Sequence, residues 1–478
     1  MARWCCCLVL VLLSGCALRP APPDASLSCQ ALFSRFDQAV ARAGVGDAQY
    51  ARIEGFPAFR IDRFLAALRD RLHGPRLRRE WLAMLRALDH EARSIEYGNL
   101  PGAARQHLPA DVLPRLAACG EQMQAGLLAE ASRWQVFLRR AEVPDAYSRW
   151  RRWLGLYPLA SRVVAWRVNV LQARLRKDFE LPLAQLPRHG RLQRYGLGPG
   201  LEMPPSLPWR PGNALAVPVP RQAELRRLLA RHAPVFEIDV ATDDDRPGTP
   251  VWGDDGLPTV DVERPVLYWR LSHARFDGQV LLQLNYMLWF PARTPRGALD
   301  IYAGRLDSLI WRVTLGPDGQ PLLYESVHGC GCYHQFYPSR RLRVRARAGE
   351  GEEPVFIPQM APEVGPGERL LVRLSAGSHY VQRLYVERGV APRHLLEVRP
   401  YRELRSLPWR EGQRRSLFGP DGLVAGSQRL ERWLLWPMGV RSAGAMRQWG
   451  QHAVAFVGRR HFDDPDLLAR YFRLADID

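Results

Sequence analysis

Residues 279–288 carry the clearest structural signal in the chain, Gln279-Val280-Leu281-Leu282-Gln283-Leu284-Asn285-Tyr286-Met287-Leu288. Apolar side chains at every second position, from Val280 to Leu288, alternate with the polar Gln283 and Asn285. This period of two is typical of a β-strand, because successive side chains of a strand point to opposite faces of the sheet. The stretch therefore predicts a strand, and with it a sheet in the C-terminal half of the chain.

A hairpin is predicted after this strand. Residues 308–315 alternate again, and the turn sequence Gly316-Pro317-Asp318-Gly319 leads into a second strand at 322–333. Further strands are expected at 267–272, 341–348, 370–375 and 381–387. The last element is predicted to be a helix capped by Asp464, with Pro465 in its first turn. Residues 234–478 are thus expected to form a mostly antiparallel β domain with a C-terminal helix.

The N-terminal part of the chain has the period of helices. Two apolar stripes show it, namely Ile61, Phe64, Leu65, Leu68 and Leu72, and then Trp81, Leu82, Leu85 and Leu88. We expect Trp150, Trp153 and Trp166 to pack helices together in the core. Residues 26–181 are therefore predicted to be a helical domain. Residues 182–233 are predicted to be a connector rich in Pro and Gly, with a short helix at 222–231. The fold class is α+β.

At the N-terminus, a short apolar run after Arg3 ends in Leu13-Ser14-Gly15-Cys16. The run is too short to span a bilayer. Its order resembles the lipobox of bacterial lipoproteins. The resemblance implies that residues 1–15 are a removed signal peptide, that Cys16 carries fatty acyl chains, and that residues 16–25 are a tether. In that class Ala17, in place of an Asp after the cysteine, indicates lipid anchoring at the periplasmic face of the outer membrane.

The positive charge of the chain limits which partners are expected. The sequence holds 67 basic and 49 acidic residues, a net charge of +18, and Lys177 is its single lysine. No RNA-binding signature accompanies the densest basic run at 340–347, so nucleic acid is not an expected partner. We expect the bilayer to be reached through the acylated Cys16. An envelope protein, anionic headgroups or an acidic glycan are the further expected partners.

Four cysteines remain after Cys5, Cys6, Cys7 and Cys16 are set aside: Cys29, Cys119, Cys330 and Cys332. An even number of cysteines in an oxidising compartment favours pairing. We predict a Cys29–Cys119 disulfide that joins the start of the mature body to a helix. In the chain-entropy model such a long loop gains about 4–5 kcal/mol.

The segment His328-Gly329-Cys330-Gly331-Cys332-Tyr333-His334 holds four possible metal ligands at alternate positions. In a strand they would share one face, and zinc prefers His and Cys thiolate ligands. A regular strand separates His328 and His334 by about 20 Å and so offers two ligands, whereas a glycine bend adds a histidine. His379, which follows small residues, is a further candidate. Alternatively, Cys330 and Cys332 form a local disulfide or exchange disulfides with other proteins.

Three functions follow from these features. The first is a membrane-anchored envelope binding or scaffold protein whose helices provide the partner surface. The second is a metal-dependent hydrolase, with zinc held by Cys330, Cys332 and a histidine from His328, His334 or His379. The third is thiol–disulfide exchange at Cys330 and Cys332. The acidic run Asp243-Asp244-Asp245 lacks the spacing of an EF-hand and is predicted to be a solvated loop.

Overall fold

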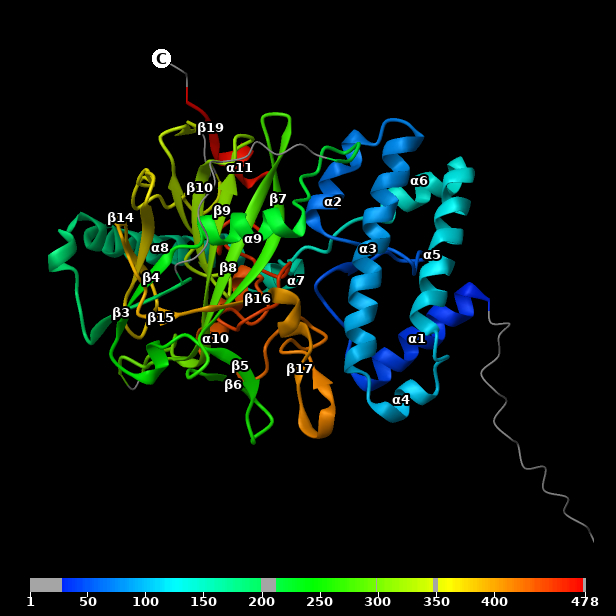
Figure 1. Ribbon diagram of the computed structural model, residues 1–478, viewed down its shortest axis with the longest axis horizontal. Coiled ribbons are helices and arrows are strands. Elements are labelled where there is room, and N and C mark those ends of the chain that lie inside the picture. The colour runs from blue at the N-terminus through cyan, green and yellow to red at the C-terminus, as the bar shows by residue number, and fades with distance from the viewer. Residues whose placement is uncertain (1–27, 199–211, 298, 347–350, 476–478) are drawn as a thin grey trace, which may run out of the picture.

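The computed structural model describes residues 28–198, 212–297, 299–346 and 351–475 (Figure 1). The predicted signal peptide, the lipidation site Cys16 and the whole tether lie outside these residues, as does part of the predicted connector, 199–211. Helices dominate the first part of the chain and mostly antiparallel sheets the later part, which confirms the predicted α+β class.

Helices α1 to α6 gather at one side of the molecule (Figure 1). Their bounds are Cys29–Ala43, Arg63–Ala67, Pro75–Asn99, Gly102–Gln106, Val112–Ala129 and Ala131–Arg140. The long α3 buries Trp81, Leu82 and Leu85, because these residues recur on one side of the helix. They share a core with Trp134 and Phe137 of α6. The predicted stripe of α3 is therefore the centre of this part.

The helix expected at residues 61–72 is broken into shorter pieces. Ile61 ends the short strand β2 (Arg60–Ile61), which pairs with β1 (Ala51–Arg52). The side chain of Asp62 then caps α2 by accepting a hydrogen bond from the backbone of Leu65, and a 3-10 turn, η1 (Leu68–Arg71), follows. A capping residue inside the apolar stripe thus starts the helix later than its spacing predicts.

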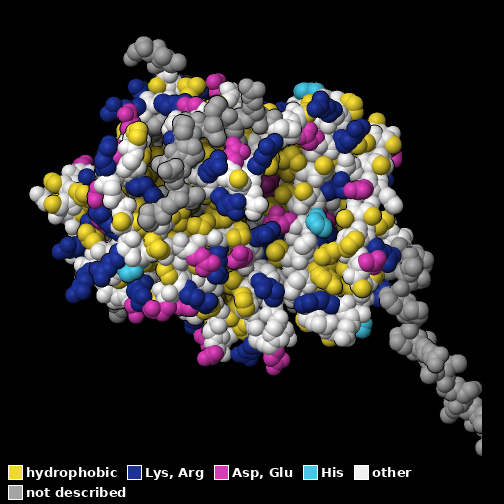
Figure 2. All heavy atoms as spheres, in the orientation of Figure 1, with side chains coloured by type: hydrophobic (Ala, Val, Ile, Leu, Met, Phe, Trp, Pro, Cys, Tyr) yellow, Lys and Arg dark blue, Asp and Glu magenta, His cyan; other side chains and the backbone are white. Residues whose placement is uncertain are grey.

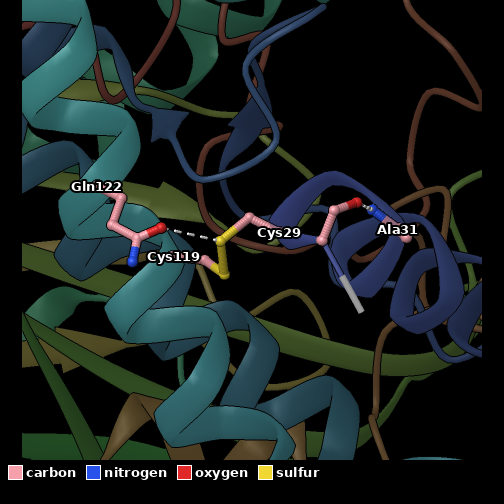
Figure 3. The surroundings of a disulfide bond; sticks show 5 residues. Cys29, Ala31, Cys119 and Gln122 are labelled. Carbon is pink, nitrogen blue, oxygen red and sulfur yellow. Dashed lines mark hydrogen bonds between the residues drawn. A yellow bond between two sulfur atoms is a disulfide. The ribbon is translucent and has the colours of Figure 1, made fainter. Parts of the chain in front are cut away.

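A disulfide joins α1 to α5 (Figure 3). It links Cys29, the first residue of α1, with Cys119, and 90 residues separate the two cysteines in sequence. Ser28 caps the same helix by accepting a hydrogen bond from the backbone N–H of Ala31. The predicted pairing is the one that the structure shows.

The larger sheet has six strands in the order β11-β10-β9-β8-β7-β16. All neighbours are antiparallel except β16 and β7, which run parallel. In that order the bounds are Gln335–Pro338, Pro321–His328, Gly304–Leu315, Gln279–Arg293, Val266–Phe276 and Glu397–Pro400. The predicted hairpin of β9 and β10 is confirmed, but β10 ends at His328 and not at residue 333.

The strand β8 is covered on both faces. Leu282, Leu284, Tyr286 and Leu288 pack into one core cluster, and Met287 and Trp289 pack into another on the opposite face. Asn285 is also buried, and its amide donates to Ser272 Oγ at 2.9 Å on β7. The alternation predicted the strand, and its polar residues bond between strands rather than face solvent.

A smaller sheet of five strands lies beside it, in the order β14-β13-β4-β3-β15. The bounds are Val381–Arg388, Glu368–Leu374, Val235–Val240, Arg191–Gly196 and His394–Leu395. Helix α9 (Gln222–His232) leads into β4 at residue 235. Parallel pairs (β13 with β4, β15 with β3) and antiparallel pairs alternate, so this sheet is mixed rather than purely antiparallel.

The end of the described chain differs from the prediction. The last helix, α11 (Leu467–Tyr471), follows Asp466 rather than Asp464, and the strand β19 (Phe472–Leu474) comes after it. Asp464 instead accepts a hydrogen bond from the backbone of Asp466 at 2.9 Å. β19 pairs with β12 (Leu342–Val344), which is shorter than the predicted strand at 341–348.

The remaining elements are short apart from α8. Two-stranded pairs are β5 (Thr249–Trp252) with β6 (Pro258–Asp261) and β17 (Leu407–Pro408) with β18 (Arg414–Arg415). The 3-10 turns are η2 (Leu183–Gln185), η3 (Asp243–Asp245), η4 (Tyr401–Arg405), η5 (Arg410–Gly412) and η6 (Trp436–Met438). Three helices remain: α7 (Arg149–Leu154), α8 (Tyr157–Glu180) and α10 (Glu431–Leu435).

Candidate functional site

Residues 328–334 form a tight turn between β10 and β11. The backbone N–H of His328 donates to the carbonyl of Cys332 at 3.0 Å, and that of Gly331 donates to the carbonyl of His328 at 2.7 Å. Gly331 has a φ of +91°, and a Cβ there would lie 2.6 Å from the carbonyl oxygen of Ala453. The expected extended strand with four ligands on one face is therefore wrong, because a glycine reverses the chain inside the motif.

Cys330 and Cys332 are free thiols, and both are buried. The backbone N–H of Cys332 donates to Cys330 Sγ at 3.4 Å. A hydrogen bond between the two side chains lowers the pKa of Cys330 and raises that of Cys332, which burial raises further. The local disulfide considered from the sequence is not formed in this structure.

Asp307 on β9 is the centre of a buried charged network. Its Oδ1 lies 3.3 Å from Nδ1 of His328 and accepts from the guanidinium of Arg429 at 3.2 Å, and its Oδ2 lies 2.9 Å from Nδ1 of His379. Burial raises the pKa of Asp307, but the charges of His328 and Arg429 and the hydrogen bonds from both histidines outweigh it and hold the pKa well below its usual value. The carboxylate is therefore ionised.

His379 lies in the turn between β13 and β14, with a φ of +52°. Its ring stacks on Phe290 at 3.9 Å between centroids, and its Nε2 is 3.4 Å from Oδ1 of Asp245. Burial lowers the pKa of His379, but its hydrogen bonds to Asp245 and Asp307 and their charges outweigh burial and raise the pKa. For His328, burial prevails and the pKa falls. His379 therefore keeps its proton to a higher pH than His328 does.

His334 belongs to a different network. Its Nε2 lies 3.0 Å from Oε1 of Glu325, and Glu325 also accepts from Nε of Arg312 at 2.7 Å. Burial lowers the pKa of His334 to about 4. Burial raises the pKa of Glu325, but the charge of Arg312 and the hydrogen bonds from His334 and Arg312 together outweigh it and lower that pKa to about 2. The structure therefore brings His328 and His379 together on one carboxylate and separates His334 from them.

The predicted zinc ligands do not converge. Across the described parts of the chain, no group of three or more His, Cys, Asp or Glu side chains is arranged to hold a metal ion. Instead, the carboxylates of Asp307 and Asp245 both contact His379, and Asp307 also pairs with Arg429. Such a buried network holds together segments that are distant in sequence.

Sequence reasoning missed Asp307, Asp245 and Arg429. Asp245 was expected in a solvated loop, but it is buried, and it also accepts from the backbone N–H of Ala241 at 2.9 Å and of Thr242 at 3.1 Å. A Thr followed three residues later by Asp is a capping pattern, and it was the available signal for this position. Asp307 and Arg429 carry no comparable local signal.

A cavity of about 240 Å³ lies between α3 and α5. Its polar lining includes Asp89, His90 and Arg93. Arg93 already donates to Asp89 at 2.7 Å, to Asp37 at 2.7 Å and to the carbonyl of Pro57 at 2.8 Å. The guanidinium of Arg93 is thus fully occupied within the protein.

Many exposed apolar side chains lie on helices α7, α8 and α10 and at their N-terminal ends, and we call this set the α7–α8–α10 face. Its side chains are 48–78% exposed, in contrast to Trp81, Trp289 and Trp311, which are fully buried. The face consists of Trp150, Trp153, Leu154, Leu156, Leu159, Val163, Trp166, Val170, Leu430, Trp433 and Leu434. The prediction that Trp150, Trp153 and Trp166 pack in the core is therefore wrong.

The three helices of this face meet at η6, which contacts all of them. Gly155, between α7 and α8, approaches η6 so closely that a Cβ would lie 2.5 Å from Cβ of Pro437. At the far end of α8, Arg383 on β14 donates to the carbonyl of Phe179 at 2.8 Å. Figure 1 places α8 beside the smaller sheet, at the opposite side of the molecule from α1 to α6. These contacts fix the position of α8 while its apolar side chains stay exposed.

No protein-family model matches this chain, and no curated protein or solved structure is significantly similar to it. Within the described residues, no helix combines the length and the apolar run that a membrane crossing requires. Figure 2 shows basic side chains scattered among acidic ones over the face in view, rather than gathered in one band. The functional argument therefore depends on the geometry of this chain alone.

Proposed function

We propose that this protein is a lipid-anchored binding protein of the cell envelope, held at the periplasmic face of the outer membrane through Cys16, and that it binds through the α7–α8–α10 face. The lipobox-like sequence supports the anchor. The exposed tryptophans support the binding surface and carry the proposal. Folded proteins rarely leave large contiguous apolar patches in water, and such patches mark interaction sites.

The burial of residues 328–334 and of their partners argues against catalysis at this site and so favours a binding function. His328, His379 and Asp307 are each at most 2% exposed, and the thiols of Cys330 and Cys332 are buried. A nucleophile or a metal-bound water must meet its substrate, so this network is better suited to a structural role. The exposed helices α7, α8 and α10 are then the part of the molecule that is accessible to a binding partner.

Binding to isolated envelope fragments tests the proposal. The full chain with Cys16→Ala is compared with a face variant that adds Trp153→Ser, Trp166→Ser and Trp433→Ser. We expect the face variant to bind at least about tenfold more weakly, which corresponds to about 1.4 kcal/mol. The matched control replaces three exposed apolar residues elsewhere, Val219, Val344 and Leu395, with Ser and keeps wild-type binding. Equal binding by the face variant and the Cys16→Ala chain would refute the proposal.

The anchor is tested separately by mass spectrometry of the mature N-terminus. We expect a chain that begins at Cys16 and carries fatty acyl chains. An unmodified chain that still contains residues 1–15 would exclude lipid anchoring.

A further inference from the structure

The exposed apolar residues of α8 form one stripe along the helix. Leu159, Val163, Trp166 and Val170 follow one another at intervals of four, three and four residues. At about 100° per residue these side chains fall within a sector of about 60° on one side of the helix. The opposite side turns toward the protein, where Leu175 is buried. α8 therefore carries an apolar stripe on its outward side in addition to the apolar side chains that pack on the protein.

Positive charge surrounds this stripe. Residues 149–177 contain eight basic residues and no Asp or Glu. Arg162 and Arg167 are exposed, and on the helix they flank the stripe on opposite sides. Neither forms an ion pair with a carboxylate of the described residues. Arginine stems lie along an apolar surface while their charged ends reach outward to a polar layer.

The same combination continues on the neighbouring helices. Arg151 lies over the ring of Trp150 at 5.3 Å, Arg167 over that of Trp166 at 5.6 Å, and Arg432 over that of Trp433 at 4.8 Å. Three Arg–Trp pairs thus lie on the three helices that meet at η6. Tryptophan is enriched at the level of lipid headgroups, because its ring is apolar and its N–H is polar.

We propose that the α7–α8–α10 face docks on a phospholipid bilayer that contains anionic headgroups. This inference rests on the proposed function and names the envelope component that the face binds. Apolar side chains enter the boundary of the acyl region, and Arg162 and Arg167 pair with headgroup phosphates. The excess of basic residues is complementary to an anionic surface.

The charge also argues against a second copy of this chain as the occupant. In a symmetric dimer the same patch meets itself, so the arginines of one copy would face those of the other. With no acidic residue between 149 and 177 to balance them, this contact is repulsive. An anionic bilayer supplies the missing negative charge.

A fluorescent reporter on the face tests the proposal directly. The full chain carries Val163→Cys together with Cys5→Ala, Cys6→Ala, Cys7→Ala and Cys16→Ala, and an environment-sensitive dye is attached to the new cysteine. Cys330 and Cys332 are buried, and Cys29 and Cys119 are paired, so they stay unlabelled in the folded protein. With vesicles of phosphatidylcholine and phosphatidylglycerol we expect a blue shift of the dye, which a dye at Val219→Cys does not show. The fluorescence of a dye at position 163 reports on the α7–α8–α10 face itself and does not depend on how the N-terminus contacts the vesicle.

A charge variant tests the role of the arginines. Arg162→Gln with Arg167→Gln is expected to weaken binding to these vesicles by about tenfold or more, because each basic residue near an anionic surface contributes to binding. The control Arg226→Gln with Arg227→Gln removes the same charge from exposed positions of α9 and retains wild-type binding. Vesicles of phosphatidylcholine alone, or salt that shortens the screening length, are expected to reduce the blue shift.

Several results would overturn the inference. The dye at position 163 could show no blue shift when vesicles are added, or it could show a blue shift that grows with protein concentration in the absence of vesicles. The variant with Arg162→Gln and Arg167→Gln could also bind vesicles as tightly as the control variant. If the face variant loses binding to native envelope fragments but the dye ignores protein-free vesicles, the face binds a protein. The proposed function then stands, and the lipid inference fails.

Discussion

Glu431, the first residue of α10, is a carboxyl group that the fold keeps away from water. It is 3% exposed, and burial raises its pKa to about 7, although the charges of Arg429 and Arg293 act in the opposite direction. An unfolded chain ionises this group near its ordinary pKa of 4.5. Between these two pH values unfolding releases a proton, so stability falls as the pH rises and then levels off above 7.

Glu431→Gln removes this dependence, because the amide stays neutral. We expect the variant to gain stability relative to the wild type as the pH is raised from 5 to 8, by about 3 kcal/mol at most. Urea unfolding at both pH values measures the difference. Glu363→Gln, at a side chain that is 79% exposed, is the control and shows no such gain. A Glu431→Gln effect that is the same at both pH values would contradict the burial argument.

The sequence predicted which residues of the candidate site are chemically notable, but it did not predict which partners they contact. The sequence identified His328, His379 and the two thiols as chemically notable, and the structure places His328 and His379 on one carboxylate. What it could not supply is Asp307 and Arg429, since each has an ordinary local pattern and gains its meaning from a partner more than 70 residues away. Long-range contacts decide which polar residues are buried.

At the level of elements, the disulfide between α1 and α5 makes a direct prediction. Replacing both Cys29 and Cys119 with Ser is expected to lower the free energy of unfolding by about 4–5 kcal/mol, because the bond closes a loop of about 90 residues in the unfolded chain. Urea unfolding without reductant measures the loss.

The control variant replaces Cys330 and Cys332, which are free thiols. Because it keeps the disulfide, we expect reductant to destabilise this control about as much as it destabilises the wild type. Reductant has no further effect on the variant without Cys29 and Cys119. If the wild type and the variant without Cys29 and Cys119 unfold at the same urea concentration, the disulfide contributes nothing to stability.

Strands were easier to predict than the environment of helices. The alternation around Leu284 and the Gly316-Pro317-Asp318-Gly319 turn specify local geometry, and the hairpin forms where they place it. The stripe of α8 also specifies a helix, but an apolar stripe shows only that something covers it. Trp166 has the same pattern whether a second helix or a lipid layer is the cover, and this is why its burial was predicted wrongly.

The whole molecule is predicted to be stable without a metal ion. Dialysis against a chelator is expected to change the melting temperature by less than about 1 °C, because the carboxylate of Asp307 already pairs with His379 and Arg429. Elemental analysis of the untreated protein is the parallel measurement. A melting temperature that falls after chelation and recovers with zinc would show that a metal site exists in this chain.

The network around Asp307 has a consequence for the timing of folding. Its members come from segments around residues 245, 307, 328, 379 and 429, so its last charge arrives after most of the chain has been arranged. Until then each ion keeps its own water, and closing such long loops costs entropy. We therefore expect these charges to pair late and together, and the chain to complete this part of its interior only when the segment around Arg429 docks.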